Sequence, residues 1–146
     1  MAKIKILLNP EYIGAVNRHE EKDCAVRALA NARNIAYSSA HSILKDFGRV
    51  DRNGTSMLIL HRAYLQAGLK CLGTYGKTQS ASYMRAWFRE LKEQKGITLS
   101  NFIKNNSKGR FVVLLRGHAT TVADGKVIDT FPISGHSSVV AVYKSE

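Results

Sequence analysis

The spacing of apolar residues changes about two thirds of the way along the chain. Five stretches are predicted to be helices. Apolar side chains recur every three or four positions in residues 39–47 and 82–94. Helix-capping residues mark the ends of 24–34, 56–67 and "TLSNFIKNN". After them, "RFVVLLRG", "HATTVADGKVIDTF" and "SVVAVYK" are rich in alternating β-branched and aromatic residues, which predicts strands. Helices followed by an antiparallel sheet indicate the α+β class.

The helix predicted over residues 24–34 begins at Cys24, with Asp23 as its N-cap. It is rich in alanine, and small side chains let neighbouring elements approach on several sides, which suits a helix in the middle of a domain. Two further stretches, "MAKIKILL" and "LKCLGTY", predict short strands. The second strand would make its cysteine, Cys71, a structural residue.

Three other helices carry side chains whose location can be predicted. The helix over 82–94 places Trp87 and Phe88 on its apolar face, so we expect them in the core and not on a surface that stacks bases. His41 and His61 lie away from the apolar stripes of their helices. We therefore expect both histidines at the surface.

Length and composition indicate one domain over residues 1–146, with 45% hydrophobic and 23% charged residues. No apolar run approaches the length of a membrane span, and "MAKIKILL" is too short for a secretion signal, so we expect no membrane contact and a cytoplasmic location. The two cysteines make neither a disulfide framework nor a zinc motif, and no other cluster has metal-ligand spacing. We expect neither a metal nor any other cofactor.

The net charge of +11, from 22 basic and 11 acidic side chains, favours an acidic partner such as a nucleic acid or an acidic protein. The basic residues are scattered and form no dense arm, so solubility alone is the alternative explanation. The charge therefore indicates a class of partner and not a site.

The segment "HATTVADGKVIDTF" predicts a hairpin that places a histidine beside a carboxylate. Asp124 and Gly125 suit the positive φ angles of a type I′ turn, and this turn sets the register of the two strands. Counting outward from the turn places His118, Thr120 and Asp129 on one face, with His118 and Asp129 as diagonal neighbours. A slip of one residue would place them on opposite faces.

His118 with Asp129 would form a base and its orienting carboxylate, and Cys24 is the candidate nucleophile for that pair. A cysteine in the first turn of a helix lies at the positive end of the helix dipole, which favours the thiolate. The alternatives are an ordinary core cysteine, a strand histidine with its polar atoms satisfied, and an aspartate that ends its strand. Asp23 next to the thiol would also raise its pKa unless its side chain is occupied in capping.

The stretches "DCAVRALA" and "GRFVVLLRGHATTVADGKVIDT" resemble the papain-like cysteine peptidase fold, and most closely small phage-encoded proteins of that fold. The resemblance implies that Cys24 is the nucleophile at the head of the central helix, His118 the base and Asp129 its orienter. It implies hydrolysis of peptide or side-chain amide bonds in a host or phage protein, in the host cytoplasm if the gene is phage-encoded. The same triad also serves deamidation and transglutamination.

The chain departs from this family where the oxyanion hole is expected. Papain-like enzymes usually place a glutamine about six residues before the nucleophile, and here that position is Arg18. Asn17 would supply the donor if the loop had one extra residue, and an ordinary loop residue is the alternative. The rival class is a catalytically inactive binding module of the same fold for an acidic partner or nucleic acid.

Overall fold

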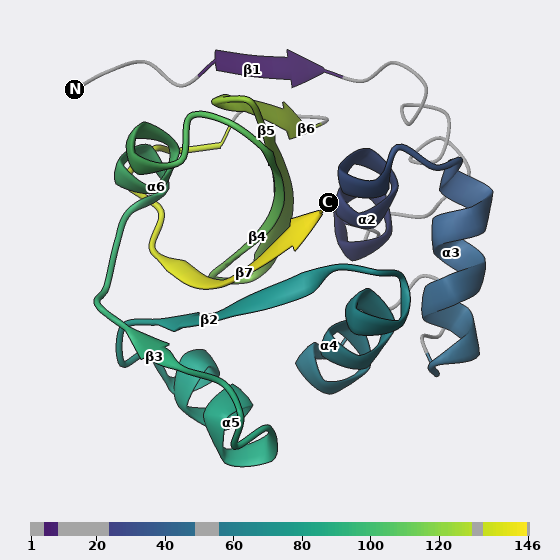
Figure 1. Ribbon diagram of the computed structural model, residues 1–146, viewed down its shortest axis with the longest axis horizontal. Helices are drawn as coiled ribbons and strands as arrows, with labels where there is room; N and C mark the ends of the chain where they lie inside the picture. Colours follow the sequence, from purple (N-terminus) through teal and green to yellow (C-terminus); the bar gives the residue numbers. More distant parts are fainter. Residues whose placement is uncertain (1–4, 9–23, 49–55, 130–132, 146) are drawn as a thin grey trace.

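A curved sheet with helices packed on it makes up the part of the chain that the computed structural model describes, residues 5–8, 24–48, 56–129 and 133–145 (Figure 1). Within these residues the sheet has seven strands in the order β1-β6-β5-β4-β7-β2-β3. The strands are β1 (Lys5–Leu8), β2 (Lys70–Tyr75), β3 (Glu93–Gln94), β4 (Arg110–Leu115), β5 (His118–Ala123), β6 (Lys126–Asp129) and β7 (Val139–Ser145). The helices are α2 (Cys24–Arg33), α3 (Tyr37–Asp46), α4 (Met57–Gln66), α5 (Gln79–Trp87) and α6 (Leu99–Asn105). The predicted α+β class is confirmed.

The sheet is antiparallel among its C-terminal strands, as predicted, and parallel at both edges, where strands from earlier in the chain pair. Strands β6, β5, β4, β7 and β2 pair antiparallel, whereas β1 pairs parallel with β6, and β3 pairs parallel with β2. The chain passes from β2 to β3 through α5, and a helical crossover of this kind returns the chain in a parallel direction. No hairpin joins β1 to its neighbour, so no turn fixes its direction.

The hairpin of β5 and β6 has the register that its turn predicts. Ala123 pairs with Lys126, and the turn residues Asp124 and Gly125 have φ angles of 48° and 79°. Both angles lie in the left-handed region that a type I′ turn requires. The side chain of Asp124 also accepts a hydrogen bond of 2.9 Å from the backbone N–H of Gly109, which holds the hairpin against the start of β4.

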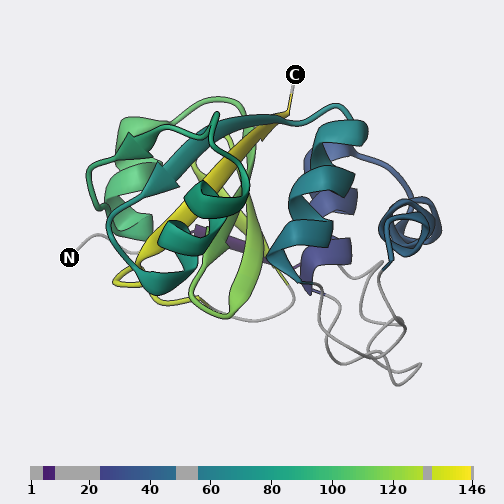
Figure 2. The ribbon, with the colours of Figure 1, turned by 90° about the horizontal axis from the view of Figure 1, so that it is seen from below.

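Apolar side chains cover both faces of the sheet. On one face they pack with α2, α3, α4 and α5, and on the other they pack with α6. In Figure 2, α2, α3 and α4 stand together beside the sheet, at the end away from α5 and α6. Helix α2 is buried from Ala25 to Ala32 because it lies between α3 and β5. Its alanines allow this close packing, as the sequence indicated.

Helix α5 ends at Trp87 and does not continue to residue 94 as predicted. At Phe88 the backbone leaves helical angles, so that Glu93 and Gln94 can pair with β2. Trp87 is therefore 50% exposed and stacks on Tyr83 with ring centroids 6.0 Å apart, which contradicts the expectation that it lies in the core. Tertiary pairing overrides the helical spacing of this segment.

His61 on α4 is also not where its helical position predicts. It is only 1% exposed, and its Nδ1 lies 2.6 Å from the hydroxyl of Tyr143 on β7. Phe88 covers the imidazole ring, with the ring centroids 4.0 Å apart. Tyr143 of the sheet and Phe88, which follows α5, both contact His61. The face of α4 that carries His61 is therefore buried, although it is not part of the helix's apolar stripe.

Candidate active site

Cys24 is the first residue of α2 and is half-buried where this helix meets the sheet. Hydrogen bonds from neighbouring elements hold the first half of the helix in place. The hydroxyl of Thr121 on β5 donates to the carbonyl of Ala28 at 2.9 Å, and the hydroxyl of Tyr64 on α4 donates to the carbonyl of Ala25 at 2.7 Å. The second bond lies in the first turn of α2, so it fixes the backbone that carries the thiol. Asp23, the predicted N-cap, lies outside the described residues.

His118 and Asp129 form a direct pair across the hairpin. Nε2 of His118 lies 2.8 Å from Oδ2 of Asp129, and the side chains are 17% and 4% exposed. The hydroxyl of Thr120 donates to the same carboxylate oxygen at 2.6 Å. The three side chains therefore share one face, and the diagonal contact that the register predicts is present.

The thiol of Cys24 contacts the strand at two points. It is hydrogen-bonded to the imidazole of His118 and to the backbone N–H of Ala119. Because Nε2 of His118 faces Asp129, Nδ1 is the ring nitrogen that is left for the thiol. The fold thus brings together Cys24, His118 and Asp129, which are far apart in the sequence.

The pKa of the Cys24 thiol is lowered, and this is the balance of opposing effects. Burial is the largest and raises the pKa, and the charge of Asp129 also raises it. The hydrogen bonds from His118 and Ala119, with the positive charge of a protonated His118, lower the pKa by more than this. The thiolate is therefore favoured despite a half-buried environment.

The pKa of His118 is raised from 6.5 to about 9. Burial alone would lower it, but the hydrogen bonds to Asp129 and Cys24 and the charges of these two groups raise it by more. The imidazole is thus favoured in its charged form at the same time as the thiol is favoured in its charged form. A thiolate–imidazolium pair with a buried carboxylate behind it is the arrangement of a nucleophile and general acid.

Two groups at this site were not predicted. The backbone N–H of Ala119 contacts the thiol, and Arg27 lines the same small cavity as Asp129. Thr120, which the register placed on this face, donates its hydroxyl to the carboxylate. Arg27 is 6% exposed; burial lowers its pKa, and the charge of Asp129 raises it. A signal for Arg27 was present in the sequence, because a residue three positions after Cys24 lies on the same helix face.

The second cysteine lies in a different environment. Cys71 belongs to β2, as predicted, and β7 and β4 separate this strand from β5. Burial raises the pKa of the Cys71 thiol, and hydrogen bonds from the backbone of Gly73 and from Tyr143 only partly offset this. No positively charged group contributes to the Cys71 pKa in the way that protonated His118 lowers the pKa of Cys24.

Asn17, the candidate oxyanion donor, lies outside the described residues. Within the described ranges, no group of three or more His, Cys, Asp and Glu side chains is placed to hold a metal ion. None of the helices that the structure describes is long and apolar enough to cross a membrane. Compared with models of known families, with curated proteins and with solved structures, the chain matches none.

Proposed function

We propose that the protein is a cysteine-dependent hydrolase of papain-like fold that transfers an acyl group from an amide to water. The observation that carries this proposal is the contrast between its two half-buried thiols. The pKa of Cys24 is lowered and that of Cys71 is raised. Only the first has an imidazole paired with a buried carboxylate. The order of nucleophile on a helix, base at the start of a strand and orienter on the next strand also agrees with the resemblance to papain-like peptidases.

The reaction follows from the two charged groups. The Cys24 thiolate attacks the amide carbonyl carbon, and a sulfur–carbon bond forms as the carbonyl π electrons move to oxygen. When the carbonyl reforms, the carbon–nitrogen bond breaks, and His118 gives its proton to the leaving amine. Water then attacks the thioester while His118 takes a proton from it. The sulfur–carbon bond breaks, and the products are a carboxylic acid and the regenerated thiolate–imidazolium pair.

The helix start is the candidate site for the transient oxyanion. The first N–H groups of a helix have no intrahelical acceptor, and they lie at the positive end of the helix dipole. The backbone N–H of Cys24 is one such donor, as in papain-like enzymes. Asn17 remains the candidate for a second donor.

An activated ester tests the acyl-transfer chemistry without knowledge of the natural substrate. With p-nitrophenyl acetate, we expect a burst of nitrophenolate and an acetyl thioester on Cys24, detected by mass spectrometry. Cys24→Ser and His118→Ala should lose the burst, and Cys71→Ser is the matched control that should keep it. Acetylation that falls equally on both cysteines, or that persists in His118→Ala, would contradict the proposal.

The alternative function is a catalytically inactive module that binds an acidic partner or nucleic acid. It is supported by the net charge of +11 and by Arg18 at the position where papain-like enzymes usually have a glutamine. Binding of this kind weakens steeply as salt is raised, because bound counterions are released from the polyanion. Salt-dependent binding to single-stranded DNA by a protein whose Cys24 gives no burst would favour this alternative.

A further inference from the structure

One edge of the sheet is only partly covered within the described residues. β3 pairs with Thr74 and Tyr75, the last two residues of β2. On this same side, the backbone N–H of Thr74 donates to the carbonyl of Lys92. The earlier part of β2, residues 70–73, pairs with β7 on its other side, with a shift of register between Cys71 and Gly73, and has no described strand on the side of β3. There the side-chain amide of Gln94 donates to the carbonyl of Leu72 at 2.7 Å. In Figure 1, β3 meets only one end of β2, and α4 lies below the other end.

A pocket of about 550 Å³ lies along this uncovered part of β2. One wall is formed by four consecutive strand residues, Lys70, Cys71, Leu72 and Gly73. The opposite wall is the segment 90–92 that leads into β3, and α4 closes the pocket with His61 and Leu65. The volume lies in the range that ligand sites occupy.

The strand residues show that the pocket runs along the edge of the sheet and not over one face. Side chains of a strand alternate between faces, so a pocket on one face is lined by every second residue. Here Cys71 packs against the core on the helix side, whereas Leu72 packs against the core on the side of α6. Both line the pocket, which therefore is a groove open to the strand edge.

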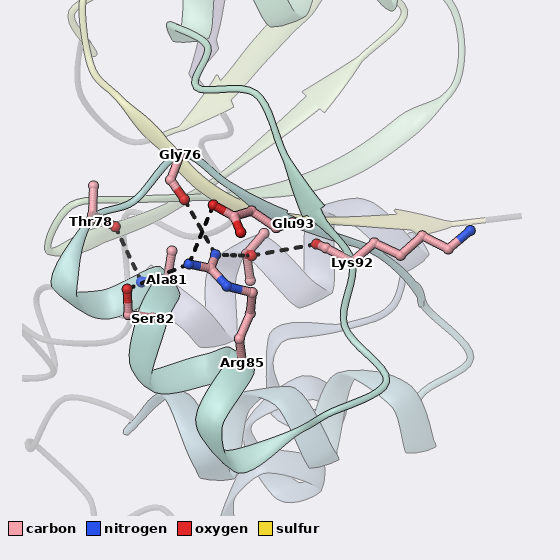
Figure 3. Close-up of polar contacts among 8 residues, drawn as sticks. Gly76, Thr78, Ala81, Ser82, Arg85, Lys92 and Glu93 are labelled. Carbon is pink, nitrogen blue, oxygen red and sulfur yellow. Dashed lines mark hydrogen bonds and ion pairs between the residues drawn. The ribbon is translucent and has the colours of Figure 1, made fainter.

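The groove is held in shape by fixed contacts at the end where β3 begins. Arg85 on α5 donates to the hydroxyl of Thr74 at 2.7 Å and to the carbonyl of Gly76 at 3.3 Å, and it lies 3.8 Å from Glu93 (Figure 3). Gly73 has a φ of 118°, and a Cβ there would lie 2.6 Å from the carbonyl oxygen of Lys92. Only glycine lets the two walls come so close, so the groove is closed at this end without a ligand.

The lining combines apolar side chains, exposed cations and one unsatisfied polar atom. The apolar residues are Leu65, Leu69, Leu72 and Leu91. Lys70 and Lys92 are exposed on opposite walls, and Glu90 is the only acidic residue of the lining. Nε2 of His61 is buried without a hydrogen-bond partner among the described residues, and the nearest carboxylate oxygen, of Glu90, lies 3.9 Å away. Such an atom is costly unless a ligand or a side-chain movement satisfies it.

We propose that this groove binds an extended, acidic polypeptide segment that adds to β2 as a further strand at residues 70–73 and displaces the Gln94 amide from the carbonyl of Leu72. Backbone groups of β2 would give affinity, and alternate apolar side chains would enter the leucine-lined groove. Lys70 and Lys92 favour carboxylates on the segment, in line with the charge of the whole chain. The proposal does not rest on Cys24, because the groove and the thiol lie on different strands and helices.

The probe is a fluorescein-labelled octapeptide with blocked ends that alternates valine and glutamate. We expect saturable binding by fluorescence anisotropy, with the largest amide NMR shifts at residues 70–73. Alternate backbone N–H groups of a strand point to opposite edges, so those of the valines and those of the glutamates lie on different edges of the peptide. Only the edge that faces β2 is used in binding. One of the two peptides, N-methylated either at the valines or at the glutamates, should therefore bind about tenfold or more weakly, and the other should keep its affinity. Lys70→Glu with Lys92→Glu should weaken it by a similar factor.

The matched control for charge is Lys104→Glu with Lys108→Glu, which changes the net charge equally at exposed positions outside the groove. This control should leave the affinity within about twofold. The proposal is overturned if both charge-reversal pairs weaken binding equally, if neither N-methylated peptide loses affinity, or if the shifts map elsewhere. Concentration-dependent shifts at residues 70–73 without peptide would overturn it in favour of pairing between two copies of the chain.

Discussion

The two cysteines form a natural comparison, because each is half-buried and each belongs to a network that contains a histidine and a carboxylate. At Cys24 the thiol contacts His118 directly, and Asp129 lies behind the imidazole. At Cys71 the thiol contacts the hydroxyl of Tyr143, and His61 lies behind that hydroxyl. The pKa of the first thiol is lowered and that of the second is raised.

The difference shows that the neighbouring charge, and not burial or the presence of a histidine, decides which thiol is activated. Tyr143 stands between Cys71 and His61, and burial raises its pKa far above the usual value, so it stays neutral. Burial lowers the pKa of His61, which therefore also stays neutral. The carboxylate of Glu90 is 67% exposed and 3.9 Å from the ring, whereas that of Asp129 is buried and in contact with His118.

The largest expected effect is on the reactivity of Cys24 when His118 is removed. In His118→Ala, only the hydrogen bond from the Ala119 N–H still offsets the effect of burial on the thiol pKa. The pKa should therefore rise, and alkylation by iodoacetamide at pH 6 should slow about tenfold for each unit of pKa. Mass spectrometry of the two cysteine peptides measures each rate separately. His61→Leu is the matched control and should leave Cys24 unchanged. An unchanged rate in His118→Ala would mean that the imidazole does not activate the thiol.

The network around Cys71 should matter for stability and not for reactivity. Tyr143→Phe removes the hydroxyl that bonds to Nδ1 of His61, and a buried polar atom left unsatisfied costs about 1–3 kcal/mol. We expect this loss in urea unfolding, with no change in the alkylation rate of Cys24. A slower Cys24 in this variant would show that the two networks are coupled.

The contributions of Cys24 and His118 to the free energy of unfolding should partly cancel as the pH changes. The pKa of His118 is raised above 6.5, so its stabilising contribution is complete below pH 6.5 and is lost as pH rises towards about 9. The pKa of Cys24 is lowered from 9.0, so its contribution is complete above pH 9.0 and is lost as pH falls. Between pH 6.5 and 9 the two contributions change in opposite directions.

Cys24→Ser separates these contributions. Only the His118 contribution remains, and its window ends below pH 9 because the thiolate no longer raises the pKa of the imidazole. The free energy of unfolding should therefore fall with rising pH above 6.5 without the opposing gain that the thiolate gives in the unmodified chain. Parallel pH profiles for the two proteins would argue against the charged pair.

The smallest expected effect is that of Thr120, which bonds to the carboxylate but not to the thiol. Thr120→Val keeps the shape and removes the 2.6 Å hydrogen bond to Asp129, so we expect a loss of about 1 kcal/mol in unfolding free energy. Cys24 alkylation should slow much less than in His118→Ala. A loss as large as that of His118→Ala would place Thr120 among the groups that orient the imidazole.

The predictions agree with the structure where contacts between adjacent residues decide the outcome, and they are wrong at the end of α5 and at His61, where distant contacts override the local pattern. The turn at Asp124 and Gly125 and the alternation of strand residues are local, and they set the register that joins His118 to Asp129. The end of α5 depends on where β3 pairs with β2, and the burial of His61 depends on Phe88 and on β7. These contacts join residues far apart in the sequence, so the spacing of neighbouring residues could not predict them.

Local patterns along the chain were enough to predict the helix that begins at Cys24 and the later hairpin that pairs a base with its carboxylate. The contact between the start of α2 and β5, which places an imidazole beside Cys24, is a property of the packed fold. The two kinds of information act over different distances. Turn chemistry and strand alternation act over a few residues, whereas the pKa of a thiol depends on the charges and burial that the packed fold places around it.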